Sequence, residues 1–351
     1  MKRNIIALDR TAKSFFIVAI IIVAFYFFGS VLMPIIFAGM VSMLLLPVVS
    51  FLERKKVNST LAVVISVVTL IIIALGILFV IFIESQDIVI QLPKLMEENK
   101  GMSNFSSGAW LPSSIQSFFE SNSEVIKENL KSMKGALLTV FKTGVTGIKG
   151  LFVFLFTCPI YIFFMLLYRN NVYRFIKEFQ RQRRSGNESE KIIDEVKQSL
   201  LQYLKGLLLV MLVVGSLTTI GLLCLGIKYA LFLGLLTAFL TPIPYIGVIV
   251  SATLPVILAF LTKDSMWYSV GVIGVYALVQ FLEGNFITPR VMGSNVNINP
   301  LIIIIGLVVI GSVTGFLGLV LTVPLLAITK VIIGHFPQLK PWSYLFEDNK
   351  S

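Results

Sequence analysis

The most restrictive feature of this chain is a long apolar block near its C-terminal end. The 39 residues from Val291 to Thr329 include no charged side chain. As one straight helix they would extend about 58 Å, whereas the hydrocarbon core of a bilayer is only about 30 Å thick. The block must therefore fold back on itself or cross a membrane twice, and we expect the turn at Thr314-Gly315-Phe316.

The composition indicates a multi-pass membrane protein. Of the 351 residues, 56% are hydrophobic and 13% are charged, which excludes an ordinary soluble domain. Seven charge-free stretches cover residues 14–52, 57–83, 150–168, 206–227, 229–262, 265–282 and 291–329. We predict an all-α integral membrane fold with about eight membrane segments, including two broken or re-entrant helical hairpins, and a small external helical insert.

Besides 291–329, two of these stretches are too long for one ordinary crossing and should contain breaks. The first is long enough for two short helices, at about 15–28 and 31–52, with a turn at Gly29-Ser30. The stretch 229–262 is interrupted by Thr241-Pro-Ile-Pro-Tyr-Ile-Gly247. Proline removes a backbone donor and disfavours a helical residue before it. Because freed carbonyls need partners in lipid, we expect this motif inside the protein or along a wet cavity, as a hairpin tip.

The distribution of Lys and Arg predicts the orientation. Basic residues gather at 2–13, 54–56 and 169–184, which fall on one side of the predicted spans and therefore face the cytoplasm. The net charge of +11 follows this pattern, so we expect no nucleic-acid partner. The predicted regions are N-terminal membrane helices at 1–83, an external insert at 84–149, a membrane helix with a cytoplasmic amphipathic helix at 150–205, a transport-like region with two hairpins at 206–335, and a cytoplasmic tail at 336–351.

The external insert contains an amphipathic stripe. Its apolar residues recur at helical spacing from Ile126 to Phe141. Such a helix could pack on the membrane surface or a neighbouring subunit, or it could form a lid over its own subunit. On the other side, about 188–205 form a second amphipathic helix that leads into the next span.

No catalytic motif is present. The chain lacks a phosphate-binding Gly-Lys-Ser/Thr loop and has a single histidine, so no paired-His metal motif is possible. We therefore expect no enzyme activity, no cofactor and no metal site. Energy for any transport would come from a gradient or a partner protein.

The remaining candidates are polar groups and helix breaks at membrane depth, a combination that transporters use to build binding sites. Gln280 and Glu283 share a helical face, and Glu283 is a candidate proton or cation site. Alternatively, Glu283 faces cytoplasmic water and pairs with Arg290. The candidate substrate or ion path comprises Thr241, Gln280, Glu283, Asn285 and Asn299. The candidate hairpin and hinge residues are Pro242, Pro244, Gly247, Pro289, Pro300, Gly311, Gly315, Gly318 and Pro324. The glycines Gly311, Gly315 and Gly318 equally suit close helix packing.

The ordered set of breaks resembles the autoinducer-2 exporter family of bacterial membrane proteins over nearly the full chain. The motifs that carry the resemblance are Tyr203-Leu-Lys-Gly206, Pro242-Ile-Pro244-Tyr-Ile-Gly247, Gln280-Phe-Leu-Glu283-Gly-Asn285, Pro289 with Met292-Gly293, Asn299-Pro300, Gly315-Phe-Leu-Gly318 and Pro324-Leu. Each motif is weak alone, but their order is fairly specific.

The resemblance implies a multi-pass transporter of the bacterial inner membrane, with a cytoplasmic N-terminus, a homo-oligomeric state such as a pentamer, and two mobile hairpins at about 229–262 and 300–332. Its partners would be the bilayer and either a small polar solute such as autoinducer-2, which is exported, or sodium or lithium ions exchanged for protons. Neutral amides and hydroxyls suit the solute, whereas a cation antiporter needs a titratable carboxylate. A function of another class stays open: a non-transporting membrane scaffold in envelope assembly, whose external helices bind a partner.

Overall fold

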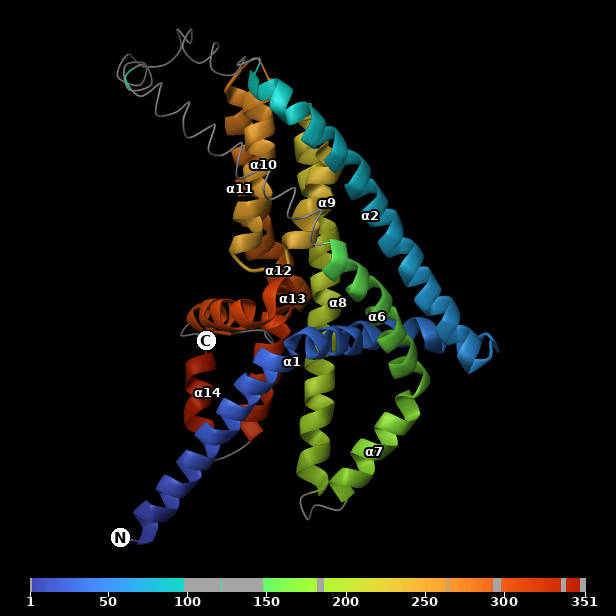
Figure 1. Cartoon of the computed structure of the whole chain (residues 1–351), viewed down its shortest axis with the longest axis vertical. Coiled ribbons are helices and arrows are strands. Elements are labelled where there is room, and N and C mark those ends of the chain that lie inside the picture. The colour runs from blue at the N-terminus through green and yellow to red at the C-terminus, as the bar shows by residue number, and fades with distance from the viewer. Residues whose placement is uncertain are drawn as a thin grey trace. The chain divides into compact units, whose positions relative to one another are not determined.

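The computed structural model describes residues 2–97, 121, 148–181, 186–263, 265–292, 298–335 and 339–347 (Figure 1). Within these residues the regular secondary structure is entirely helical. The helices are α1 (Lys2–Arg54), α2 (Ser59–Glu97), α6 (Ile148–Leu167), α7 (Arg169–Arg181), α8 (Gly186–Cys224), α9 (Ala230–Leu240), α10 (Ile246–Thr262), α11 (Trp267–Leu282), the π-helix η1 (Glu283–Ile287), α12 (Thr288–Met292), α13 (Pro300–His335) and α14 (Lys340–Phe346).

The described helices fit a multi-pass membrane protein. By length and composition, five of them could cross a membrane: Phe25–Arg54, Ser59–Ile88, Asp194–Cys224, Trp267–Met292 and Pro300–His335. Three shorter apolar helices accompany them at Phe154–Leu167, Ala230–Leu240 and Ile246–Thr262. Within the described residues, the prediction of an all-α fold with several candidate membrane spans is therefore confirmed.

The chain divides into two compact units. Unit 1 comprises Met1–Val68, Phe154–Lys205 and Ser294–Ser351, and unit 2 comprises Thr69–Val153 and Gly206–Gly293. The hairpin formed by α9 and α10 therefore belongs to unit 2, and α13 belongs to unit 1. The predicted amphipathic helix on the cytoplasmic side and the span after it form one helix, α8. Most of the predicted external insert, including its amphipathic stripe, lies outside the described residues, and its first part, 84–97, continues α2.

The predicted turn at Gly29-Ser30 is wrong, because α1 continues through both residues. The structure gives Gly29 a different role. A Cβ atom on Gly29 would lie 3.0 Å from the Cγ2 atom of Thr314 in α13, so the glycine permits close helix packing rather than a reversal. The helix bends along its course (Figure 1), and it contains Pro34 and Pro47, the residue type that most often kinks a helix.

The apolar block at the C-terminal end folds back at Gly315, as its length requires. Gly315 has φ 68° and ψ −148°, which interrupts α13 with a non-helical residue. On either side the two arms are in close contact: a Cβ atom on Gly311 would meet Leu319, and one on Gly306 would lie 3.0 Å from Thr322 Cγ2. Residues at similar distances before and after Gly315 therefore face each other, which defines an antiparallel helical hairpin.

The open end of this hairpin is closed by α14. The buried Phe346 side chain packs with Ile298 and Ala327, and partly buried residues of both arms surround this cluster. The Asn299 backbone N–H donates a hydrogen bond to the Phe346 carbonyl at 3.1 Å. The C-terminal helix is thereby fixed to the base of the α13 hairpin.

Unit 2 is built around α8, α9, α10 and α11. Its buried core includes Leu222, Leu233, Leu258 and Val272, one from each helix. Small residues bring α8 and α9 together, because a Cβ atom on Gly215 would lie 2.8 Å from the Ala238 side chain and 3.1 Å from a backbone oxygen of α9. The apolar α9–α10 hairpin is thus packed against longer helices.

Candidate functional site

The break between α9 and α10 forms a compact tip, as predicted. Helix α9 ends at Leu240 and α10 begins at Ile246. The backbone N–H of Ile243 donates to the Leu240 carbonyl, and that of Gly247 donates to the Ile243 carbonyl, both at 3.0 Å. The tip therefore provides hydrogen-bond partners for some of its own backbone groups. A helix break in an apolar environment requires such partners. Pro242 and Ile243 are buried beneath it.

Gly247 is required at this tip for space. A Cβ atom at this position would overlap the carbonyl oxygen of Leu240, which is part of the backbone and cannot rotate away. Helix α10 can therefore follow the tip in this geometry only if residue 247 is a glycine. The hydroxyl of Thr241 donates to the Thr237 carbonyl at 2.8 Å, so its proton is used within its own helix.

A buried polar network that sequence reasoning missed joins the hairpin to α11. The hydroxyl oxygens of Tyr276 and Thr237 are 2.9 Å apart, and the Tyr276 hydroxyl donates to the Ser251 carbonyl at 3.1 Å. All three residues are at most 5% exposed. The sequence indicates these residues only in that each is a polar residue within an apolar segment. Because buried polar groups in lipid need partners, the three could have been suspected to meet.

The register between α10 and α11 places Glu283 close to the level of the tip. Ser269 bonds to the Val256 carbonyl at 3.4 Å and Tyr276 bonds to the Ser251 carbonyl, so the two helices are antiparallel (Figure 1). Glu283 lies seven residues beyond Tyr276, or about 10 Å along the axis. Counted back from Ser251 toward the tip, the first residue of α10 is only about 7.5 Å away. Measured along the axis, Glu283 therefore lies beyond the start of α10, at about the level of the tip.

The segment that carries Glu283 is a π-helix rather than the end of a helix. Residues Glu283–Ile287 form η1, which continues α11 into α12. π-Helical turns within α-helices occur frequently at functional sites. The Asn285 side-chain amide donates to the Phe281 carbonyl at 2.9 Å, which satisfies a carbonyl next to the widened turn.

The partly buried Glu283 carboxylate has a neutral partner. It accepts a side-chain hydrogen bond from Gln280, one helical turn earlier. Among the described residues it forms no ion pair, and Arg290 instead lies over the Phe286 ring, 5.8 Å from the ring centroid. The alternative in which Arg290 neutralises Glu283 is therefore not what the structure shows.

The structure brings only part of the predicted set together. Thr241, Pro242, Pro244 and Gly247 form the tip, and Gln280, Glu283 and Asn285 lie at about its level at the end of α11 and in η1, all within unit 2. Pro289 follows in α12 without ending the helix. Asn299, Pro300, Gly311, Gly315, Gly318 and Pro324 belong to unit 1. There the Asn299 side-chain oxygen accepts from the Leu301 N–H at 2.9 Å, as a cap at the start of α13.

In the part of the chain that the structure describes, no cluster of three His, Cys, Asp or Glu side chains could hold a metal ion. The polar groups around the tip are one carboxylate, amides and hydroxyls. Such groups can hydrogen-bond a small polar solute or bind a single cation or proton.

Comparison with known proteins identifies relatives over nearly the full length. The family described as "AI-2E family transporter" matches residues 15–338. Two candidate transport proteins of Bacillus subtilis (strain 168) are similar: YueF is 30% identical over 333 residues, covering 89% of this chain and 86% of YueF, and YrrI is 27% identical over 320 residues, covering 89% and 88%. The AI-2 transport protein TqsA of Escherichia coli (strain K12) is 24% identical over 318 residues, covering 90% of this chain and 88% of TqsA.

Proposed function

The chain belongs to the AI-2E transporter family, and from this premise we propose that it is a secondary transporter that exports a small polar solute, with autoinducer-2 as the first candidate. The observation that carries the proposal is the position of Glu283 and Gln280 beside the tip of the α9–α10 hairpin. The relative TqsA is named as an AI-2 transport protein, which supports testing this solute first.

The polar groups at the tip suit an uncharged, hydroxyl-rich solute. Gln280 and Asn285 are exposed amides on successive turns, and Glu283 adds an acceptor between them. A helix widened at η1 aims successive side chains differently from a regular α-helix. We propose that these groups replace water around the solute while the tip, held by Pro242 and Pro244, opens and closes beside them.

We further propose that both hairpins are re-entrant and act as moving gates. The eleven residues of α9 extend about 16 Å, and the fifteen residues of 300–314 extend about 22 Å, both shorter than the roughly 30 Å of a bilayer core. Each first arm is therefore too short to cross alone. A hairpin that enters and leaves on one side needs no crossing, and it can tilt about its open end.

Exchange of sodium or lithium for protons is the second candidate function. The favouring observation is that Glu283 is a partly buried carboxylate without an ion-pair partner among the described residues. Ionisable residues at membrane depth commonly mark ion or proton pathways. In either case we place the protein in a bacterial cytoplasmic membrane with its N-terminus inside. We propose a homo-oligomer, with a pentamer as the first stoichiometry to test.

Reconstitution into proteoliposomes separates the two candidates. Autoinducer-2 is loaded inside and its release is followed, and in parallel an internal pH dye reports proton flux after sodium or lithium is added. Release that depends on the protein and is lost in Glu283→Gln supports solute export. Cation-triggered proton flux lost in the same variant supports antiport. Well-folded protein that shows neither activity contradicts both assignments of this site. Asp87→Asn, an exposed change on α2, is the matched control.

A further inference from the structure

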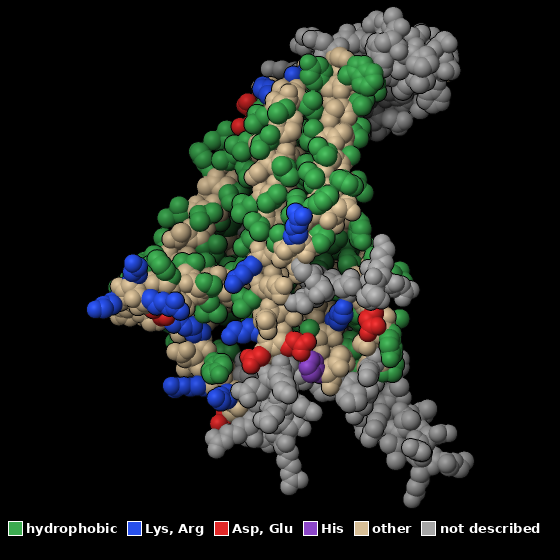
Figure 2. All heavy atoms as spheres, turned by 180° about the vertical axis from the view of Figure 1, so that it is seen from behind, with side chains coloured by type: hydrophobic (Ala, Val, Ile, Leu, Met, Phe, Trp, Pro, Cys, Tyr) green, Lys and Arg blue, Asp and Glu red, His purple; other side chains and the backbone are tan. Residues whose placement is uncertain are grey.

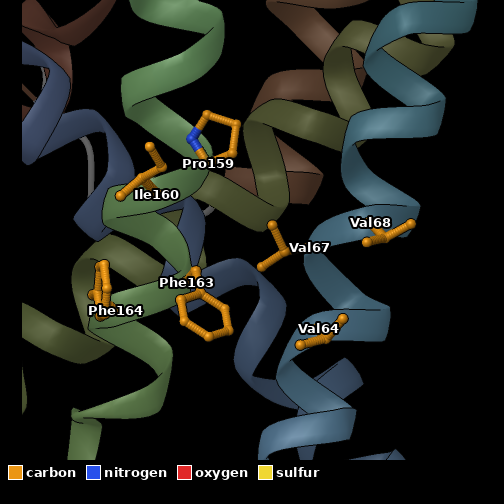
Figure 3. Close-up of a pocket in the computed structure, with 7 residues that line it drawn as sticks. All are labelled: Val64, Val67, Val68, Pro159, Ile160, Phe163 and Phe164. Atoms are coloured by element: carbon orange, nitrogen blue, oxygen red, sulfur yellow. The ribbon is translucent and has the colours of Figure 1, made fainter.

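An apolar groove lies between α2 and α6 within unit 1. It has a volume of about 260 Å³ and is lined only by apolar side chains: Val64, Val67, Val68, Pro159, Ile160, Phe163 and Phe164. Val67 and Phe163 point toward each other across it (Figure 3). Val67 is 6% exposed, whereas Ile160 and Phe164 are about half exposed, so the groove has a buried floor and open rims.

This lining cannot bind a polar solute, because it provides no hydrogen-bond donor or acceptor side chain. Both walls are parts of apolar helices, and α2 is one of the candidate membrane spans. In a bilayer such a groove opens toward the acyl chains of lipids. A single chain can fill it and bury the exposed rims of the groove.

The ion pair between Arg169 and Glu53 lies near one end of both walls of the groove. Val64 lies five residues after Ser59 on α2, about 7.5 Å along the helix, and Phe164 lies five residues before Arg169, the first residue of α7. Arg169 Nη2 donates to Glu53 Oε1 at 2.6 Å, and Glu53 also accepts a hydrogen bond from Ser59. The turn between α1 and α2 is thereby attached to the end of α6 at the base of the groove.

One nitrogen of this arginine has an unused bonding capacity. Arg169 Nη1 is buried and has no hydrogen-bond partner in the structure. A buried guanidinium donor without an acceptor is unfavourable. Guanidinium groups bind phosphate oxygens well, and Nη1 could donate to one only after the atoms that cover it move aside.

The surrounding charges are mostly positive. The α1–α2 turn and α7 contribute Arg54, Lys55, Lys56, Arg174 and Lys177 in addition to Arg169, whereas the acidic residues of 53–56 and 169–178 are Glu53 and Glu178. Lys55 and Lys56 are exposed. Figure 2 shows basic side chains gathered where α1 turns into α2. Such clusters beside membrane helices favour anionic headgroups.

We propose that this place is a binding site for an anionic phospholipid of the surrounding bilayer. One acyl chain occupies the groove between α2 and α6, and the phosphate lies at the basic end, between Arg169 and the lysines of the α1–α2 turn. The groove provides apolar contact and the basic cluster selects the charge of the headgroup. The lipid would thereby join α2 to α6 in unit 1.

Native mass spectrometry of the full chain in detergent tests the site. The protein is titrated with phosphatidylglycerol and with phosphatidylcholine of identical acyl chains. We expect the wild type to prefer phosphatidylglycerol and Lys55→Gln/Lys56→Gln to reduce its binding by about tenfold, with little change for phosphatidylcholine. The matched control is Lys197→Gln/Lys205→Gln, which removes two exposed lysines of α8.

A second variant examines the groove. Val67→Phe fills its floor and should weaken both lipids equally, with Val48→Phe on an exposed position of α1 as its control. Equal binding of the two lipids by the wild type would overturn the proposal, as would unchanged phosphatidylglycerol binding in the lysine variant. Displacement of the lipid by soluble glycerol phosphate would also overturn it, because it would make the site a phosphate site rather than a lipid site.

Discussion

The hydroxyl of Tyr276 lies 2.9 Å from the hydroxyl of Thr237, and this contact joins α11 to α9 within the core of unit 2. Because Tyr276 also donates to the Ser251 carbonyl on α10, a single phenol connects both arms of the hairpin to a neighbouring helix. When Tyr276 donates to Ser251, it can only accept from Thr237, and the Leu233 carbonyl at 2.8 Å is the alternative acceptor for the single Thr237 proton. The hairpin beside Glu283 is therefore held by polar contacts as well as by apolar packing.

Tyr276→Phe should destabilise unit 2. The change removes the hydroxyl and leaves the Ser251 carbonyl without this donor, at a cost of about 0.6–1.7 kcal/mol for hydrogen bonds between membrane helices. A lower apparent melting temperature in detergent would measure it. Tyr173→Phe, at an exposed position of α7, should melt like the wild type. Equal melting of both variants would show that the network contributes no stability.

Glu283→Gln should abolish most transport and leave the fold intact. The amide keeps the size and hydrogen bonding of the side chain but cannot bind a proton or cation as a carboxylate does. The measurement is initial flux in proteoliposomes containing equal amounts of protein, compared with Asp87→Asn. Wild-type flux in the Glu283 variant would remove this residue from the mechanism.

Gly247→Ala should impair folding, because the added methyl group overlaps the Leu240 carbonyl oxygen. Overpacking of this kind costs about 1–3 kcal/mol. Gly274→Ala in α11 is the matched control, since its Cβ atom would meet nothing within 4 Å. Membrane-inserted yield and melting temperature should fall only for Gly247→Ala. A wild-type yield and stability would show that the tip can rearrange around a side chain.

Gly315→Ala should destabilise the α13 hairpin through the backbone alone. Its Cβ atom would have space, but φ 68° with ψ −148° is a conformation that only glycine adopts readily. The strain amounts to about 1–3 kcal/mol. Gly334→Ala, also without a neighbour within 4 Å, should be tolerated. Comparable melting of the two alanine variants would contradict a required left-handed residue at the turn.

The two hairpin breaks could be predicted because they follow from length and from residue type. A block of 39 residues without charge exceeds a bilayer, and Gly315 lies near its middle. Pro242 and Pro244 interrupt α9–α10 by removing donors. The prediction of a turn at Gly29-Ser30 was wrong because a glycine in an apolar segment can mark either a turn or a close contact between helices. At Gly29 the glycine is needed for close contact with Thr314 of α13. The sequence alone cannot distinguish this role from a turn, because it does not give the position of α13.

The candidate site was predicted in part. Gln280 and Glu283 share a helical face, which spacing alone shows. The π-helical turn at Glu283 was not predicted, although Pro289 follows it in α12 and cannot donate to the Asn285 carbonyl within η1. The network of Thr237, Ser251 and Tyr276 depends on the register between three helices, and residues 14 to 39 positions apart give no periodic signal. Asn299, expected on the substrate path, uses its side-chain oxygen as a helix cap.

The shortness of the first hairpin arms has a consequence for biosynthesis. An arm such as α9, with eleven residues, cannot leave the protein-conducting channel as a stable transmembrane segment. It can partition into lipid only after its partner arm has emerged and the two have paired. If the hairpins are re-entrant as proposed, we expect each to be released as one unit, after its second arm has been synthesised. The order of synthesis, rather than the hydrophobicity of each arm, thus sets when these segments enter the membrane.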